Sequence, residues 1–194
     1  IDDGQTNAAV LQGFTVTNGN SVFTNGYSGH GGGIYVEASP TIQDNIITGN
    51  EAAFHGGGLY SEGGDVVLLN NTFSDNVADF DGGGAYLKDT DALIEGNQFL
   101  DNEADDDAGG LFLGVGSLPE VRWNVFAENE CSGVNNPGGT VGWGGGLVLH
   151  TNTDADVHNN LFVGNVASTE GGAVYFHSSS PTFTNNSLFD NHVV

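Results

Sequence analysis

Four aspartates recur at a spacing that could bring their carboxylates together around a metal ion. Asp79 and Asp81 lie two residues apart, and the same pair returns 26 residues later as Asp105 and Asp107. If repeats of this length stack as parallel strands, equivalent carboxylates lie roughly 4.8 Å apart and repel one another. Calcium prefers oxygen ligands in flexible geometry. The spacing therefore predicts a calcium site at these four residues, and a solvated acidic surface is the alternative interpretation.

Two tryptophans suggest a second kind of chemistry, the stacking of sugar rings on indole. Trp123 occupies a turn position that holds Asp, Asn or Gly in the other repeats. Trp143 ends an insertion at about 132–143, and insertions in repeat proteins form loops that often bind ligands. Trp123 and Trp143 are therefore our candidate carbohydrate ligands, although Trp143 could instead fold over the loop and cover the core.

The two basic residues have acidic neighbours one repeat away, which argues against a role as catalytic bases. Lys and Arg together number 2, and they are Lys88 and Arg122. Glu62 precedes Lys88 by one repeat at the same position, and Glu95 precedes Arg122 in the same way. We predict exposed ion pairs here, which stabilise a fold little. No catalytic residue is assigned, and the sequence favours a non-enzymatic role without deciding it.

The composition sets further limits on function. Among 194 residues, 25 are Asp or Glu and the formal net charge is −23, which excludes binding to nucleic acid or to an anionic membrane. No apolar run is long enough to span a membrane. An acidic excess with almost no Lys suits a high-salt or calcium-containing exterior, where repulsion between carboxylates is screened or neutralised. The single cysteine, Cys131, falls at a position of small residues and is predicted to lie in the core.

An internal repeat organises nearly the whole chain. Each copy combines a Gly-rich unit, followed by an apolar residue, with an Asn-x-apolar-x-x-Asn unit. Apolar residues that alternate after the glycines indicate strands rather than helices. The Asn units are Asn45/Asn50, Asn71/Asn76, Asn97/Asn102, Asn124/Asn129, Asn160/Asn165 and Asn186/Asn191, and the Gly units begin at Gly31, Gly56, Gly82, Gly109, Gly144 and Gly171.

A single repeat of this kind cannot bury its own apolar face, whereas stacked copies can. We predict an all-β parallel solenoid of about seven coils, each with about three short strands. The Asn columns are interpreted as structural, because their amides can bond local backbone and the Asn of the next coil. Residues 1–194 are expected to form one β-helix domain, a fragment of a longer solenoid on which further coils could stack end to end.

The Gly-Gly-[Gly/Ala]-[Ile/Leu/Val] and Asn-x-Phe-x-x-Asn units resemble the repeats of the polymorphic outer-membrane protein family. More broadly, they resemble right-handed parallel β-helix proteins of the pectin-lyase-like superfamily. The resemblance implies a right-handed parallel β-helix that is secreted or anchored at a cell surface. That superfamily includes adhesins, polysaccharide lyases and glycoside hydrolases, so the likeness specifies a fold more than a function.

Short and similar turns favour a structural or adhesive segment of an extracellular or cell-surface protein, stabilised by calcium, with glycans or host and cell-surface components as partners. The alternative is a carbohydrate-active domain, lyase-like or hydrolase-like. Asn152-Thr153-Asp154, Asp105-Asp106-Asp107 and Gly29-His30-Gly31 resemble three polygalacturonase signatures. Their order along the chain differs from that family, and its Arg-x-Lys type motif is missing.

Overall fold

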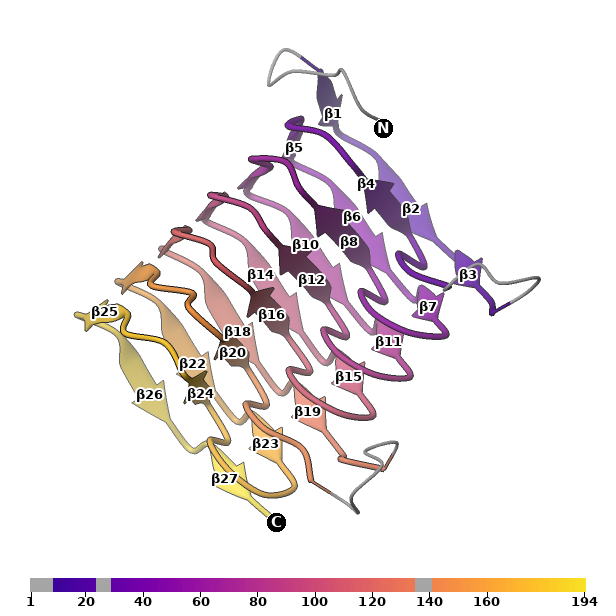
Figure 1. The fold of residues 1–194 in the computed structure, drawn as a ribbon. Coiled ribbons are helices and arrows are strands. Elements are labelled where there is room, and N and C mark those ends of the chain that lie inside the picture. Colours follow the sequence, from indigo (N-terminus) through magenta and orange to yellow (C-terminus); the bar gives the residue numbers. More distant parts are fainter. Residues whose placement is uncertain (1–8, 24–28, 135–140) are drawn as a thin grey trace.

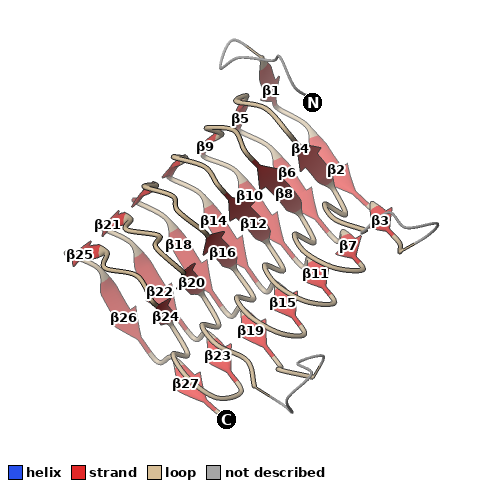
Figure 2. Ribbon diagram, viewed as in Figure 1, coloured by secondary structure: helices blue, strands red, loops and turns tan. Residues whose placement is uncertain are grey.

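The chain winds into a parallel β-solenoid in which successive coils lie one above the next (Figure 1). The structure is a computed structural model, and it describes residues 9–23, 29–134 and 141–194. All strand pairs are parallel and in register, and each full coil adds one strand to each of four sheets. Strands and turns alternate through the described residues, with no helix among them (Figure 2).

Each of the four sheets runs along the axis of the solenoid. The first contains β1 (Val10–Gln12), β5 (Thr41–Gln43), β9 (Val67–Leu69), β13 (Leu93–Glu95), β17 (Glu120–Arg122), β21 (Asp156–His158) and β25 (Thr182–Thr184). The second contains β2 (Thr15–Thr17), β6 (Ile46–Thr48), β10 (Thr72–Ser74), β14 (Gln98–Leu100), β18 (Val125–Ala127), β22 (Leu161–Val163) and β26 (Ser187–Phe189). The third contains β3 (Asn20–Ser21), β7 (Glu51–Ala52), β11 (Val77–Ala78), β15 (Glu103–Ala104), β19 (Glu130–Cys131), β23 (Val166–Ala167) and β27 (His192–Val193). The fourth contains β4 (Ile34–Val36), β8 (Leu59–Glu62), β12 (Ala85–Lys88), β16 (Leu111–Gly114), β20 (Leu147–His150) and β24 (Val174–His177).

The core consists of ladders of like side chains, because in-register pairing places equivalent residues of successive coils in contact. Four phenylalanines of the second sheet are fully buried and stack with ring centroids 4.7–4.9 Å apart. Burial of each such side chain stabilises the fold by roughly 1.5–3 kcal/mol. Cys131 packs between Ala104 and Ala167 in the third sheet, which confirms its predicted place in the core. The stacked phenylalanines are Phe73, Phe99, Phe126 and Phe162.

Each full coil has four strands rather than the expected three, because one corner directly precedes the Asn unit and a second corner lies inside it. In the third coil these corners are Asn70 and Asp75, whose φ angles are 53° and 54°. This left-handed conformation ends a strand and suits Asn, Asp and Gly. A two-residue strand therefore follows the second corner, here β11, and forms a sheet of its own.

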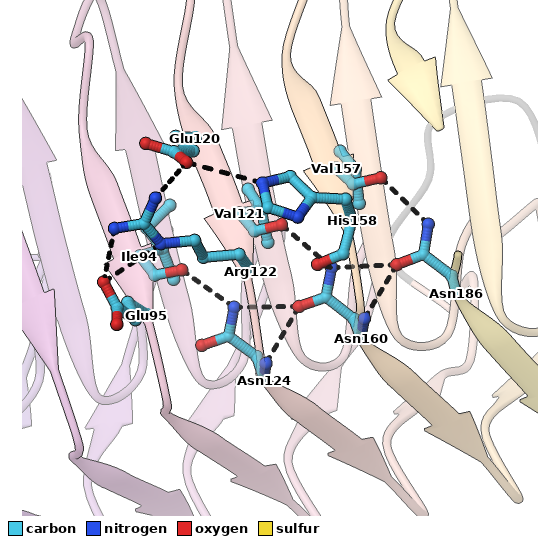
Figure 3. Close-up of polar contacts among 10 residues, drawn as sticks. All are labelled: Ile94, Glu95, Glu120, Val121, Arg122, Asn124, Val157, His158, Asn160 and Asn186. Carbon is cyan, nitrogen blue, oxygen red and sulfur yellow. Dashed lines mark hydrogen bonds and ion pairs between the residues drawn. The ribbon is translucent and has the colours of Figure 1, made fainter. Parts of the chain in front are cut away.

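The buried Asn columns are structural, as predicted. The Asn102 side chain accepts hydrogen bonds from the backbone N–H and the Nδ2 of Asn76, at 3.1 and 2.9 Å. Its own Nδ2 donates to the carbonyl of Phe73 and to Oδ1 of Asn129, at 3.0 and 2.9 Å. Each side chain thus satisfies buried groups in the coil before it and the coil after it. Figure 3 shows the same pattern at Asn124, Asn160 and Asn186.

The Gly triplets allow neighbouring coils to approach closely before the fourth sheet. A β-carbon built on Gly83 would lie 2.2 Å from the carbonyl oxygen of Glu103 and 2.6 Å from that of Gly109. No side chain fits in that space without separating the coils.

The outer face of the fourth sheet carries a second apolar cluster, in which Tyr60, Tyr86 and Phe112 stack along the axis and are 3–8% exposed.

Candidate functional site

The acidic site lies in the turns that lead from the third sheet to the fourth. Asp79 and Asp81 occupy the turn between β11 and β12, and Asp105, Asp106 and Asp107 occupy the turn between β15 and β16. Both flanking strand pairs are in register, which places the two turns side by side in adjacent coils. Parallel stacking therefore brings the predicted carboxylates into one region of the surface.

Three of these carboxylates converge. Asp81, Asp106 and Asp107 each offer one oxygen, and these oxygens lie within 4.8 Å of one another. The backbone N–H of Asp107 donates to Oδ1 of Asp81 at 3.2 Å. Oδ1 of Asp107 in turn accepts the backbone N–H of Trp143 at 2.9 Å. The acidic triad, which we define as Asp81, Asp106 and Asp107, thus touches three successive coils.

The Asp107 carboxyl sits in surroundings that disfavour its charge. It is 7% exposed, whereas Asp81 and Asp106 are half-buried. Burial raises the pKa of Asp107 to about 8, the hydrogen bond from Trp143 opposes this rise, and the charges of Asp81 and Asp106 add to it. A carboxyl of this kind is protonated at neutral pH or has its charge balanced by a cation.

Asp79 and Asp105 lie outside the acidic triad. Asp79 is exposed, and the half-buried Asp105 accepts a hydrogen bond from Oγ of Ser132 at 3.3 Å. Burial raises the pKa of Asp105, the Ser132 bond lowers it, and the negative charge of Asp79 raises it further. The expected set of four thus contributes Asp81 and Asp107 to the triad, and Asp106 is the third member.

The position of Asp106 explains why column patterns do not select it. The equivalent residues in the two preceding coils are Phe54 and Phe80, which stack on each other at 4.9 Å. The column is therefore aromatic until it reaches Asp106. One coil before Asp81 lies His55, whose Nδ1 is 3.2 Å from Oδ2 of Asp81, so an imidazole adjoins the triad on that side.

The donor set of the acidic triad suits a hard cation. Its three groups offer carboxylate oxygens from adjacent coils, the ligand chemistry that Ca²⁺ takes in flexible geometry. When Asp107 is ionised its charge is poorly hydrated because the side chain is buried, so a bound cation would stabilise the ionised form. A cation bound here would join two coils and the residues that end the insertion.

The two candidate sugar-binding tryptophans lie at different corners of the solenoid. Trp123 lies between the first and second sheets, is 60% exposed and has a φ of 58°. It lines a shallow cavity of about 360 Å³ together with Leu161 and Asn185. Trp143 lies between the third and fourth sheets, where its half-buried ring stacks on Tyr175 with centroids 5.1 Å apart. The expected insertion at 132–143 is described except for 135–140.

Both basic residues form the predicted ion pairs. Nζ of Lys88 lies 2.6 Å from Oε1 of Glu62, and this hydrogen bond raises the pKa of Lys88 and lowers that of Glu62. The guanidinium of Arg122 bonds Glu95 through Nε at 3.0 Å and Nη2 at 2.7 Å, and it also pairs with Glu120 (Figure 3). The predicted structural role of these side chains is thus supported by their geometry.

Comparison with known families agrees with this architecture. The model of the family described as the right-handed beta helix region matches residues 1–188. The chain belongs to the right-handed β-helix family. No curated protein and no solved structure matches it. As a right-handed β-helix the chain has the predicted fold, while the closer resemblance to polymorphic outer-membrane repeats stays a prediction.

Membership of the right-handed β-helix family is compatible with a structural or a carbohydrate-active type of domain. Which of the two this β-helix is depends on its side chains rather than on its fold. Within 9–23, 29–134 and 141–194, the β-helix has no helix long and apolar enough to cross a membrane.

Proposed function

We propose that this β-helix is a rigid structural or adhesive segment of an extracellular protein, and that calcium bound at the acidic triad stabilises it. The observation that carries the proposal is the convergence of Asp81, Asp106 and Asp107 with one carboxyl buried. The net charge of −23 also supports an exterior that contains calcium and salt, because both reduce repulsion between carboxylates. Glycans or other components of a cell surface are the proposed adhesive partners.

The location of the triad supports a structural role for the cation. Asp81 and Asp107 belong to adjacent coils, and Asp107 also holds the backbone of Trp143 in the coil beyond. A cation shared by these carboxylates opposes separation of the coils along the axis. A bound cation would also offset the repulsion between ionised carboxylates of the triad, whose oxygens lie within 4.8 Å of one another.

Calcium titration tests the site. Isothermal calorimetry compares the wild-type chain, freed of metal with EDTA and dialysed, with Asp81→Asn/Asp107→Asn and with Asp79→Asn/Asp105→Asn. Both double variants replace two aspartates by asparagine in the same two turns, but the second leaves the triad intact. We expect saturable calcium binding in the wild type and the control, and its loss in the first variant. Equal loss in both variants, or no saturable binding in the wild type, would contradict the site.

A second candidate function is carbohydrate binding at Trp123, and one observation favours it. A large aromatic side chain with a φ of 58° and 60% exposure is costly in both backbone strain and hydration. The neighbouring amide of Asn185 and the apolar side chain of Leu161 line the same cavity. An indole beside amides is a suitable platform for a neutral sugar ring, which has both apolar and hydroxyl faces.

Tryptophan fluorescence tests this binding with cellohexaose and xylohexaose as neutral probes. Trp123→Ala removes the exposed indole, while Trp143→Ala removes the indole that stacks on Tyr175 and serves as the control. We expect either probe to change the fluorescence of the wild type and of the Trp143 variant, with no change in the Trp123 variant. No change in the wild type with either probe would contradict sugar binding there.

A further inference from the structure

Two asparagines at one corner of the solenoid begin the tripeptide Asn-x-Ser/Thr. The tripeptides are Asn70-Asn71-Thr72 and Asn185-Asn186-Ser187. The first residue of each lies at the corner between the first and second sheets, and the third residue begins a strand of the second sheet. This tripeptide is the acceptor signal for N-linked glycosylation, and the signal is useful only where the first Asn is exposed.

The corner presents both acceptor amides to solvent. Asn70 and Asn185 are exposed and have φ angles of 53° and 55°, so each projects from a sharp turn. Among the described residues, neither side-chain amide has a hydrogen-bond partner, in contrast to the buried amides of Asn71 and its equivalents. Gly96 in the next coil leaves room beside Asn70, because a β-carbon there would lie 2.4 Å from Oδ1 of Asn70.

The hydroxyl groups that complete the signal are also available. Thr72 and Ser187 are the first residues of β10 and β26, and the residue after each, Phe73 or Leu188, occupies the inward column of the second sheet. Alternation along the strand therefore directs both hydroxyls outward. In the described part of the chain neither hydroxyl is engaged in a hydrogen bond.

We propose that Asn70 and Asn185 are acceptors of N-linked glycans, a modification that rests on the proposed extracellular location. The co-reactant is an oligosaccharide linked through a diphosphate to a membrane lipid, and an oligosaccharyltransferase catalyses the transfer. Nδ2 of the asparagine forms a bond to C1 of the first sugar and loses one proton. The bond from C1 to the diphosphate oxygen breaks, and the lipid diphosphate leaves with the electron pair.

Asn159 provides a built-in control at the same corner. It has a φ of 59° and lies one coil before Asn185, but the residue two positions later is Leu161. Asn159 therefore shares the backbone turn of Asn70 and Asn185, but it lacks the Ser or Thr hydroxyl two residues later. Asn159 should carry no sugar in the wild type, and Leu161→Thr should convert it into a third acceptor.

A glycan on Asn185 would also give the exposed Trp123 a neighbour. Trp123, Asn185 and Ser187 line the same shallow cavity of about 360 Å³. A sugar on Nδ2 of Asn185 would therefore begin at the edge of the cavity that Trp123 also lines.

The test expresses the chain behind a secretory signal in yeast and measures its mass before and after enzymatic removal of N-glycans. We expect two glycans on the wild type, one on Thr72→Val, one on Ser187→Ala, none on the double variant and three on Leu161→Thr. Peptide mapping should find Asp in place of Asn70 and Asn185 after glycan removal. Protein from both the medium and the cell interior is analysed, so a folding defect does not hide the result.

Wild-type protein without sugar in both fractions would overturn the proposal, as would sugar that persists in the double variant. Unglycosylated protein in the medium would leave the extracellular function standing while the acceptor sites fail. Glycosylated protein that is retained and misfolded in cells would support the acceptor sites and count against a stable extracellular segment.

Discussion

The carboxylate of Asp107 accepts the backbone N–H of Trp143 at 2.9 Å, across an interval of 36 residues that contains the insertion. The equivalent hydrogen bond one coil earlier runs from the backbone N–H of Asp107 to the carboxylate of Asp81. It joins residues that are only 26 positions apart in the sequence. The turn therefore keeps the same register on both sides of the insertion. Asp107 is 7% exposed, whereas Asp81 is half-buried.

Burial of Asp107 predicts a pH-dependent stability. Its folded-state pKa of about 8 exceeds the ordinary Asp value near 4, so its stabilising contribution is fully present below pH ~4 and is lost as the pH rises through 8. In Asp107→Asn this loss should be absent because an amide does not titrate, and the amide oxygen can still accept the Trp143 N–H. At pH ~9 the variant should be more stable than the wild type. The wild type loses roughly 1.4 kcal/mol of unfolding free energy for each pH unit between the ordinary Asp pKa and its folded-state pKa.

Urea unfolding in EDTA at several pH values from ~4 to ~9 measures this difference. Asp101→Asn is the matched control, because it removes the same charge at an exposed corner. Parallel stability profiles for the wild type and Asp107→Asn would show that the carboxyl does not titrate in this range.

Asn102→Ala should destabilise the solenoid strongly. The substitution leaves the N–H of Asn76 and the carbonyl of Phe73 without their partners in the interior, at about 1–3 kcal/mol for each group. Asn191 has the equivalent position in the last coil, where it is half-buried, and water can replace its bonds. Asn191→Ala should therefore cost about 1 kcal/mol or less. Chemical denaturation measures the free energy of unfolding of both variants. Equal losses of stability would contradict a larger contribution from the fully buried asparagines.

Gly83→Ala should be far more damaging than Gly63→Ala. A β-carbon at Gly83 meets the carbonyl oxygen of Glu103 at 2.2 Å, whereas one at Gly63 has nothing within 4 Å. Gly63 has a φ of 73°, so alanine there costs only about 1 kcal/mol of backbone strain. Circular dichroism during thermal unfolding should show a small shift for the Gly63 variant and loss of the cooperative transition for the Gly83 variant. Similar melting temperatures would contradict the close approach of the coils.

Most of the fold is predictable from columns of residues in the sequence. The spacing of Asn45 from Asn71 already implies the ladder, and the apolar residues on either side imply the strands. The fourth strand in each coil was not predicted, because the turn at residues such as Asp75 depends on a φ angle that composition suggests but does not assign. The aromatic cluster around Tyr86 was missed as well, since alternation places that ring on the outer face.

The candidate site is less predictable, because its chemistry depends on burial and not on spacing. The repeat spacing selects Asp81 and Asp107, which belong to the acidic triad, and also Asp79 and Asp105, which lie outside it. Asp106 has no acidic equivalent in the coils before it. Asp107 is 7% exposed and accepts the backbone N–H of Trp143, 36 residues away, and the repeat spacing gives no signal for either feature.

Thermal unfolding with and without calcium tests the central claim most directly. The wild type, Asp81→Asn/Asp107→Asn and Asp79→Asn/Asp105→Asn are melted in EDTA, in millimolar calcium, and in NaCl at matched ionic strength. A hundredfold excess of calcium over its dissociation constant should stabilise the wild type by about 2.7 kcal/mol, or roughly 5–10 °C. The control variant should keep this gain and the triad variant should lose it. Equal stabilisation by NaCl and calcium in all three chains would contradict a calcium site and leave a solenoid that salt alone stabilises.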